Sequence, residues 1–278
     1  QELGETPQLI FWVDAKTLRS SAFYAGMANS AESLFKKAFV SSKCMRKTKL
    51  ADFDYALLLG SDFDTPKERG YLAVSGSFDA PKLLKCLASE LKWNQTQEGG
   101  TILYEETSGT VKSRFYAAGP NVFVLLASNW AKPVAPGTGK LGKGQIAGLA
   151  GVNVLAIHYE PSGGQEFKTM EGTAVAGTDL DFNGHVVFNR TKMAIEYQKK
   201  ADAAKQQIVS SGLPVSKSIR FARTNKRIDA HATVTTSEFV LLMGFIENAL
   251  GGSGGSNTSA PPSSAPPSSP GTNPPVVP

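Results

Sequence analysis

Two aspartates and a histidine, Asp179, Asp181 and His185, lie close together in a segment whose pattern predicts a β-hairpin. A three-residue loop at 182–184 pairs apolar with apolar residues, so we prefer it to a two-residue Asn183-Gly184 loop. It places Asp181 opposite His185 and all three side chains on one side of the hairpin. Two carboxylates and an imidazole there could hold a divalent cation or make the histidine a base. The alternative is a polar strand face with one weak ion pair.

The stretch Pro136–Gln145 approaches the spacing of a phosphate-binding loop, with Gly137, Gly142 and Lys143 in the required places. Gly144 stands where that loop needs a Ser or Thr hydroxyl for magnesium, and no strand ends directly before it. We interpret the stretch as a flexible linker and expect no nucleotide. The chain also has no dinucleotide fingerprint and no Cys/His zinc spacing, so we expect no cofactor.

A second apparent motif is the G-x-S-x-G pattern around Ser253, which is typical of a nucleophile elbow. A catalytic triad of that class needs an acid and a histidine later in the chain. Neither follows Ser253, so the match carries no catalytic meaning.

Positive charge is unevenly spread, although the net charge of the chain is only +5. Two segments carry clusters of basic residues that could attract an anionic partner. The alternative is that both are ordinary solvated faces. The candidate anion-binding residues are Lys36, Lys37, Lys43, Arg46, Lys47 and Lys49 in the first cluster, and Arg220, Arg223, Lys226 and Arg227 in the second.

The chain has two cysteines, Cys44 in a predicted loop and Cys86 on a predicted helix. A disulfide between them is geometrically possible, and two free buried thiols are the alternative. The even count, the Pro/Ser-rich end of the chain and the missing initiator methionine favour an exported protein. No apolar run approaches the roughly 20 residues that a spanning helix needs, so we do not expect the chain to cross a membrane.

In the first half of the chain, the sequence pattern predicts mainly strands, together with a helical segment at 17–40 and a helix from Asp79 to Lys92. Gly26 and Asn29 in the middle of the first segment predict two helical pieces or a bend. Asp79 is a suitable N-cap for the second helix. Strands before and after the Thr65–Arg69 turn should pair antiparallel.

In the second half of the chain, the sequence pattern predicts two hairpins and two helices. One helix runs from Thr191 to Gly212, and the second hairpin turns near Asn225. Thr235 and Glu238 then form a capping box before a final helix that is apolar nearly all round. That helix is either buried beneath a sheet or a surface for a partner.

We therefore predict an α+β fold of two lobes, each an antiparallel sheet packed by one or two helices, followed by a disordered C-terminal tail. Half of the 16 prolines lie after residue 250, where no charged or aromatic side chain occurs, and such a segment buries too little surface to fold. The predicted order is a leader at 1–7, a first lobe at 8–130, a Gly/Lys/Pro-rich interlobe linker at 131–151, a second lobe at 152–250 and the tail at 251–278.

The stretch "FDYALLLGSDFDTPKERGYLAVSGSFDAPKLLKCL" resembles uncharacterised exported or lipid-anchored bacterial envelope proteins, which share a hairpin and a helix that starts with G-x-F-D-x-x-x-L. The hairpin, the helix ending in "GLP" and the T-x-x-E helix of the second half are similar to the same group. The resemblance covers most of residues 8–250 and implies a bacterial exported protein without catalytic residues to transfer. The chain has no cysteine at its start that could carry a lipid.

These observations favour a non-enzymatic, exported protein that binds or scaffolds a partner at the cell envelope, such as another envelope protein. One alternative is a binder of an anionic polymer, nucleic acid or acidic glycan, through both basic clusters, which then have to meet on one face. A third is a metal-assisted hydrolase at Asp179, Asp181 and His185.

Overall fold

The computed structural model describes residues 7–61, 69–108, 111–128, 153–161, 166–210 and 218–251. The predicted leader, linker and tail lie outside these ranges, apart from single residues at the inner ends of the leader and the tail. The phosphate-loop-like stretch and Ser253 lie outside them as well.

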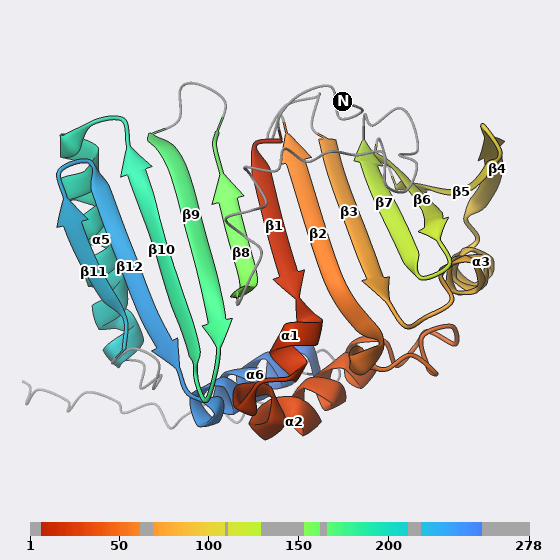
Figure 1. The fold of residues 1–278 in the computed structure, drawn as a ribbon, viewed down its shortest axis with the longest axis horizontal. Coiled ribbons are helices and arrows are strands. Elements are labelled where there is room, and N and C mark those ends of the chain that lie inside the picture. Colours follow the sequence, from red (N-terminus) through yellow and green to blue (C-terminus); the bar gives the residue numbers. More distant parts are fainter. Residues whose placement is uncertain are drawn as a thin grey trace, which may run out of the picture.

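The described strands form one antiparallel sheet of twelve strands (Figure 1). Its spatial order is β11-β12-β10-β9-β8-β1-β2-β3-β7-β6-β5-β4. The strands are β1 (Leu9–Asp14), β2 (Phe53–Ser61), β3 (Arg69–Gly76), β4 (Asn94–Glu98), β5 (Thr101–Ser108), β6 (Val111–Gly119), β7 (Val122–Ser128), β8 (Asn153–Tyr159), β9 (Phe167–Ala176), β10 (Leu180–Phe188), β11 (Arg220–Thr224) and β12 (Arg227–Val234).

The helices pack against this sheet in three groups. α1, α2 and α6 gather at one end of the central strands, α3 lies near β6 and β7, and α5 lies along β11 and β12 (Figure 1). The helices are α1 (Ala15–Arg19), α2 (Ala22–Ala38), the single 3₁₀ turn η1 (Leu50–Asp52), α3 (Ala80–Leu91), α5 (Thr191–Ser210) and α6 (Thr236–Gly251).

The α+β class and the antiparallel sheet with helices packed on it are confirmed, but the two halves do not have separate sheets. β1 pairs with β2 on one side and with β8 of the second half on the other, so that Trp12 lies between Leu57 and Ala156. The physical reason is that an unpaired edge on β1 or β8 would leave a row of backbone N–H and C=O groups without partners. Joining the halves removes both edges.

The helical segment after β1 is divided as predicted, but the break lies earlier than Gly26. Asp14 caps α1 by accepting a bond from the Thr17 amide at 2.7 Å, and Ser21 starts α2 by accepting from Tyr24 N at 3.1 Å. Gly26 lies within α2, where a Cβ would overlap the methyl carbon of Thr236 on α6. The glycine therefore permits close helix packing instead of a bend.

The largest core lies where α2 and α6 cover β8, β9 and β10. The ring of Phe23 on α2 meets that of Phe239 on α6 edge to face, with centroids 5.5 Å apart. The predicted capping box starts α6, because Thr235 N donates to Glu238 and Glu238 N donates back to Thr235 Oγ1. The buried members of this core are Phe23, Met27, Ala31, Val154, Ala174, Leu180 and Val234.

Two smaller cores fix the helices at the ends of the sheet. Asp79 caps α3 as predicted, accepting from Lys82 N at 3.0 Å, and Leu84 and Ala88 of this helix pack on Tyr104. At the other end, Ala194 of α5 is buried with Phe188 and Ile228. Thus α3 and α5 are held at positions far apart along the sheet (Figure 1).

Candidate functional site

The structure corrects the predicted hairpin that was to assemble Asp179, Asp181 and His185. The turn lies between β9 and β10, where Ala176 pairs with Leu180, so Asp179 is a turn residue. Asn183 and Gly184 lie in the middle of β10 instead of in a loop. Asp181 and His185 are on the same strand, four residues apart, and do not face each other across a hairpin.

The reason for the mistaken turn is visible at Gly184. It pairs with Gly172 on β9, and a Cβ at position 184 would lie 2.9 Å from the carbonyl oxygen of Glu171. Glycine is therefore needed here for a close approach between strands. An Asn-Gly pair alone cannot distinguish that need from the left-handed residue of a tight turn.

Asp181 and His185 have separate partners. The Thr233 hydroxyl donates to Asp181 Oδ1 at 2.7 Å, whereas His185 Nε2 lies 3.6 Å from Glu171 Oε2. Within the described ranges, no group of three His, Cys, Asp or Glu side chains is placed to hold a metal ion. The predicted metal triad is therefore not assembled.

Glu171 and His158, which the sequence reasoning did not select, belong to the same polar strand face. Glu171 lies between two imidazoles, with Oε1 3.1 Å from His158 Nδ1 and Oε2 facing His185. Each contact becomes an ion pair only when the histidine is protonated. Glu171 and His185 line a shallow cavity of about 450 Å³, together with Asn183, Arg220, Arg227, Asp229 and His231. Only the strand register could have revealed this grouping.

The second basic cluster lies at the β11 edge of the sheet, and part of its charge is compensated. Arg227 forms an ion pair with Asp229 at 2.6 Å, and Arg223 donates to Gln198 and to the Asn225 carbonyl. Asn225 has φ +56°, which confirms the predicted turn between β11 and β12. The segment is thus tied to its own hairpin and to α5.

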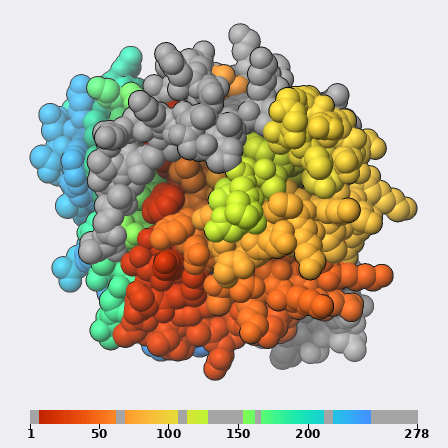
Figure 2. Space-filling view, turned by 45° about the vertical axis from the view of Figure 1, so that its right-hand side comes forward, coloured from red at the N-terminus to blue at the C-terminus, as the bar shows by residue number. Residues whose placement is uncertain are grey.

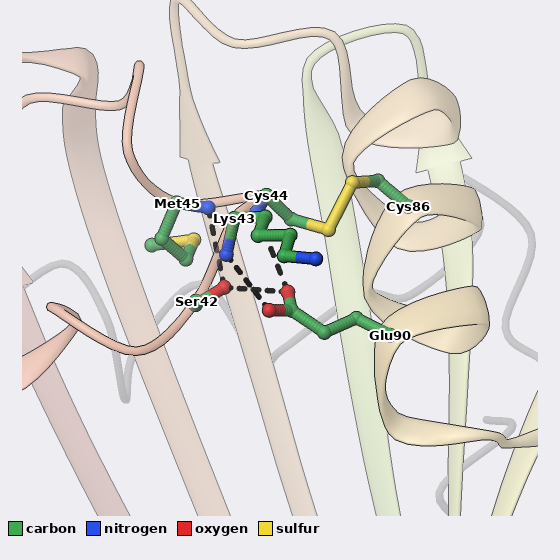
Figure 3. The surroundings of a disulfide bond; sticks show 6 residues. All are labelled: Ser42, Lys43, Cys44, Met45, Cys86 and Glu90. Atoms are coloured by element: carbon green, nitrogen blue, oxygen red, sulfur yellow. Dashed lines mark hydrogen bonds between the residues drawn. A yellow bond between two sulfur atoms is a disulfide. The ribbon is translucent and has the colours of Figure 1, made fainter.

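The first basic cluster is anchored covalently, because Cys44 and Cys86 form a disulfide with a Cα–Cα distance of 5.7 Å. The bond joins the loop after α2 to the exposed side of α3 (Figure 3). The sequence left open a disulfide or two free buried thiols, and the disulfide is confirmed. The cysteines are separated by 42 positions in the sequence, so the bridge closes a long loop.

Glu90, one turn beyond Cys86 on α3, provides a second anchor for the same loop (Figure 3). Its carboxylate accepts bonds from Lys43 N at 2.7 Å, from Ser42 Oγ at 2.8 Å and from Cys44 N at 3.3 Å. The bond from the Lys43 amide, followed by that from Ser42, lowers the pKa of the Glu90 carboxyl below its ordinary value. The ionised carboxylate and the disulfide together fix the loop on α3.

We call the basic side chains of this region the anchored basic surface. They are exposed to solvent, and Figure 2 shows the segment after α2 along the lower edge of the molecule. Lys82 lies one turn before Cys86 on α3, so both segments contribute to one surface. Its members are Lys36, Lys37, Lys43, Arg46, Lys47, Lys49, Lys82 and Lys85.

Four acidic residues occur within residues 32–52 and 79–90, and the carboxylate of each is hydrogen-bonded to the backbone. Each accepts a bond from a main-chain amide: Glu32 from Leu50 and Asp52 from Lys49, in addition to Asp79 and Glu90 as described above. Lys36 also forms an ion pair with Glu32 at 3.7 Å. The carboxylates stabilise the local fold, and the eight basic side chains are exposed to solvent.

The two basic clusters predicted to meet on one face do not do so. The anchored basic surface lies beside α3, near the β6 and β7 end of the sheet, whereas residues 220–227 form its opposite edge (Figure 1). The intervening strands of the sheet separate them. A single short polymer segment therefore cannot contact both clusters in the way that the two-cluster hypothesis requires.

Comparison with known proteins adds little to this geometry. No known family model matches the chain, and no curated protein matches it. A solved structure, "Structure of crystal form I of TP0453", is similar over 88% of this chain and 96% of that chain, with 13% identity and a TM-score of 0.47. Within the described residues, no helix is both long and apolar enough to cross a bilayer.

Proposed function

We propose that this chain is a non-enzymatic, exported binding protein of the cell envelope, and that it engages an anionic partner through the anchored basic surface. The observation that carries the proposal is the arrangement of charge on this surface. The carboxylates of this region bond to main-chain amides, and its basic side chains are exposed on α2, on α3 and on the loop that the disulfide fixes to α3. Such a surface attracts anions over a distance comparable to the Debye length.

The disulfide supports the exported location. Bridges of this kind persist in oxidising compartments and are rare where glutathione and thioredoxin keep thiols reduced. Here the bridge fixes the segment that carries the basic cluster, so the proposed binding surface depends on the compartment in which the bond is stable. The two cysteines leave no free thiol.

Of the two clusters, the anchored basic surface is the better site. In the second cluster, Asp229 compensates the charge of Arg227, and Gln198 occupies one N–H donor of Arg223, so less charge and fewer donors remain for a partner. At the first, Arg46 and Lys47 are exposed on the loop that the disulfide holds in place. The proposal therefore needs one surface and does not require the clusters to meet.

Binding to a soluble anionic polymer tests this function. We expect wild-type protein to bind dextran sulfate with an affinity that falls steeply with salt, because binding releases condensed counterions. The double variant R46Q/K47Q should bind more weakly, and its negative slope of log affinity against log salt should be shallower by about 2.

The matched control is K192Q/K199Q, which removes two exposed lysines from α5 at the other end of the sheet. It should bind as the wild type does. Equal losses in both variants would show that only net charge matters, and undiminished binding by R46Q/K47Q would refute the proposed site.

A further inference from the structure

Large apolar side chains lie exposed within the anchored basic surface. Phe39 is 41% exposed and Val40 70% exposed at the end of α2, and Leu91 is 55% exposed at the end of α3. Val40 precedes Ser42 by two residues, and Leu91 follows Glu90. Because Ser42 and Glu90 are hydrogen-bonded, the two exposed groups are brought to the same part of the surface.

This combination has a specific chemical meaning. A soluble anionic polymer offers charge to the lysines but little apolar volume in which Val40 and Leu91 can be buried. An anionic bilayer offers both, since its headgroups attract basic residues and its acyl region accepts apolar side chains. Stable attachment to a membrane surface generally needs two such signals together.

We propose that the anchored basic surface docks on an anionic phospholipid bilayer, with Val40 and Leu91, flanked by Phe39, inserting at the headgroup boundary. This inference rests on the proposed function and specifies its partner. Because the disulfide and Glu90 already hold the loop on α3, the apolar groups are presented without further ordering of the backbone on binding.

The exposed apolar residues of α5 and α6 lack this setting. Ile195 and Val209 on α5 are 39% and 50% exposed, but the exposed lysines of this helix are interspersed with exposed Glu196 and Asp202. An anionic surface would repel those two carboxylates, which lowers the net attraction. Leu241 on α6 is 54% exposed, and residues 236–244 of α6 contain no lysine or arginine. In contrast to α5 and α6, the anchored basic surface combines exposed basic side chains with exposed apolar side chains, and the carboxylates of its region are bonded to main-chain amides.

The test is sedimentation with vesicles of phosphatidylcholine, with and without phosphatidylglycerol. We expect the full chain to bind only the anionic vesicles, and V40S/L91S to lose about tenfold in affinity for them. The control I195S/V209S makes the same kind of change on α5 and should bind normally. A folded V40S/L91S protein should retain its affinity for dextran sulfate, because its charges are unchanged.

Insertion itself has a separate readout. The variant Val40→Trp should show a blue shift of its added tryptophan emission with anionic vesicles, whereas Val209→Trp should not. Failure of the wild type to bind anionic vesicles while it binds dextran sulfate would overturn the bilayer proposal and leave the proposed function intact. Equal vesicle binding by V40S/L91S would also overturn it, and binding to neither probe would refute both.

Discussion

A single carboxylate, Glu90, shows how the charge pattern of this protein arises. Its contacts with Ser42, Lys43 and Cys44 turn a negative group in a basic region into an anchor for the backbone. A carboxylate that accepts several such bonds is favoured in its charged form. The loop consequently gains order, while the ammonium groups of its lysines remain in water.

Acid should release this anchor. The pKa of Glu90 is lower in the folded protein than in the unfolded chain, where it is about 4.3. The stabilising contribution is therefore fully present above that unfolded value and is lost as the pH falls through the folded pKa. An NMR titration of the Glu90 carboxyl carbon should give a midpoint below the value for a glutamate in an unfolded chain.

The substitution E90Q should reproduce the acid effect at neutral pH. The amide hydrogens of Lys43 and Cys44 should exchange faster, because a neutral side-chain amide is a weaker acceptor than a carboxylate. E196Q on α5 is the control and should leave this exchange unchanged. Unaltered protection of both amides in E90Q would show that the disulfide alone holds the loop.

Gly26 provides a second test at the residue scale. Alanine would raise helix propensity by about 1 kcal/mol, but its Cβ would overlap the Thr236 methyl group across the contact of α2 with α6. We expect overpacking to dominate and G26A to lose about 1–2 kcal/mol in urea unfolding. T236S removes the obstructing methyl, so G26A/T236S should be more stable than G26A. Purely additive effects would contradict this packing account.

At the scale of elements, the disulfide should contribute to stability mainly through the unfolded chain. For cysteines 42 positions apart, the chain-entropy relation gives about 4 kcal/mol. The variant C44S/C86S should unfold at correspondingly lower urea concentration and should bind dextran sulfate more weakly, since residues 39–49 lose their covalent anchor. Wild-type protein treated with reductant should show the same losses of stability and binding as C44S/C86S. Reductant should change neither property in C44S/C86S itself.

The elements that the sequence predicted well carry their signals locally. Asp79 caps α3, Thr235 and Glu238 cap α6, and Asn225 turns the last hairpin, because in each case the partner atom lies within three residues. The predicted turn at 182–184 was wrong for the opposite reason. The requirement for Gly184 comes from Glu171 across the strand pair, and a single sequence does not show which strands pair.

The candidate sites follow the same division. The disulfide and the first basic cluster were predictable as possibilities, since they depend on residue types and on loop and helix assignments. The inward bonds of Glu32 and Glu90 were not predictable, because they link residues that are 18 and 47 positions apart in the sequence. Those bonds decide how much of the positive charge faces water.

At the scale of the whole molecule, β1 connects the two halves by pairing with β2 and β8. Smaller cores lie within each half, but the largest core joins α2 of the first half to strands of the second. The pairing of β1 with β8 involves residues more than 140 positions apart. Local periodicity contains no information about such a contact, so one continuous sheet was not foreseen.

This continuity predicts that the halves lose stability together. Trp12 of β1 stacks on Tyr55 with centroids 5.3 Å apart and packs beside the buried Ile10, Leu59 and Ala156. W12A should remove about 3 kcal/mol from global stability, as large-to-small changes in cores do. Native-state hydrogen exchange should then show β6 and β10 amides losing the same protection, although these strands belong to different halves. If β10 retained its wild-type protection in W12A, the halves would unfold as separate units despite their shared sheet.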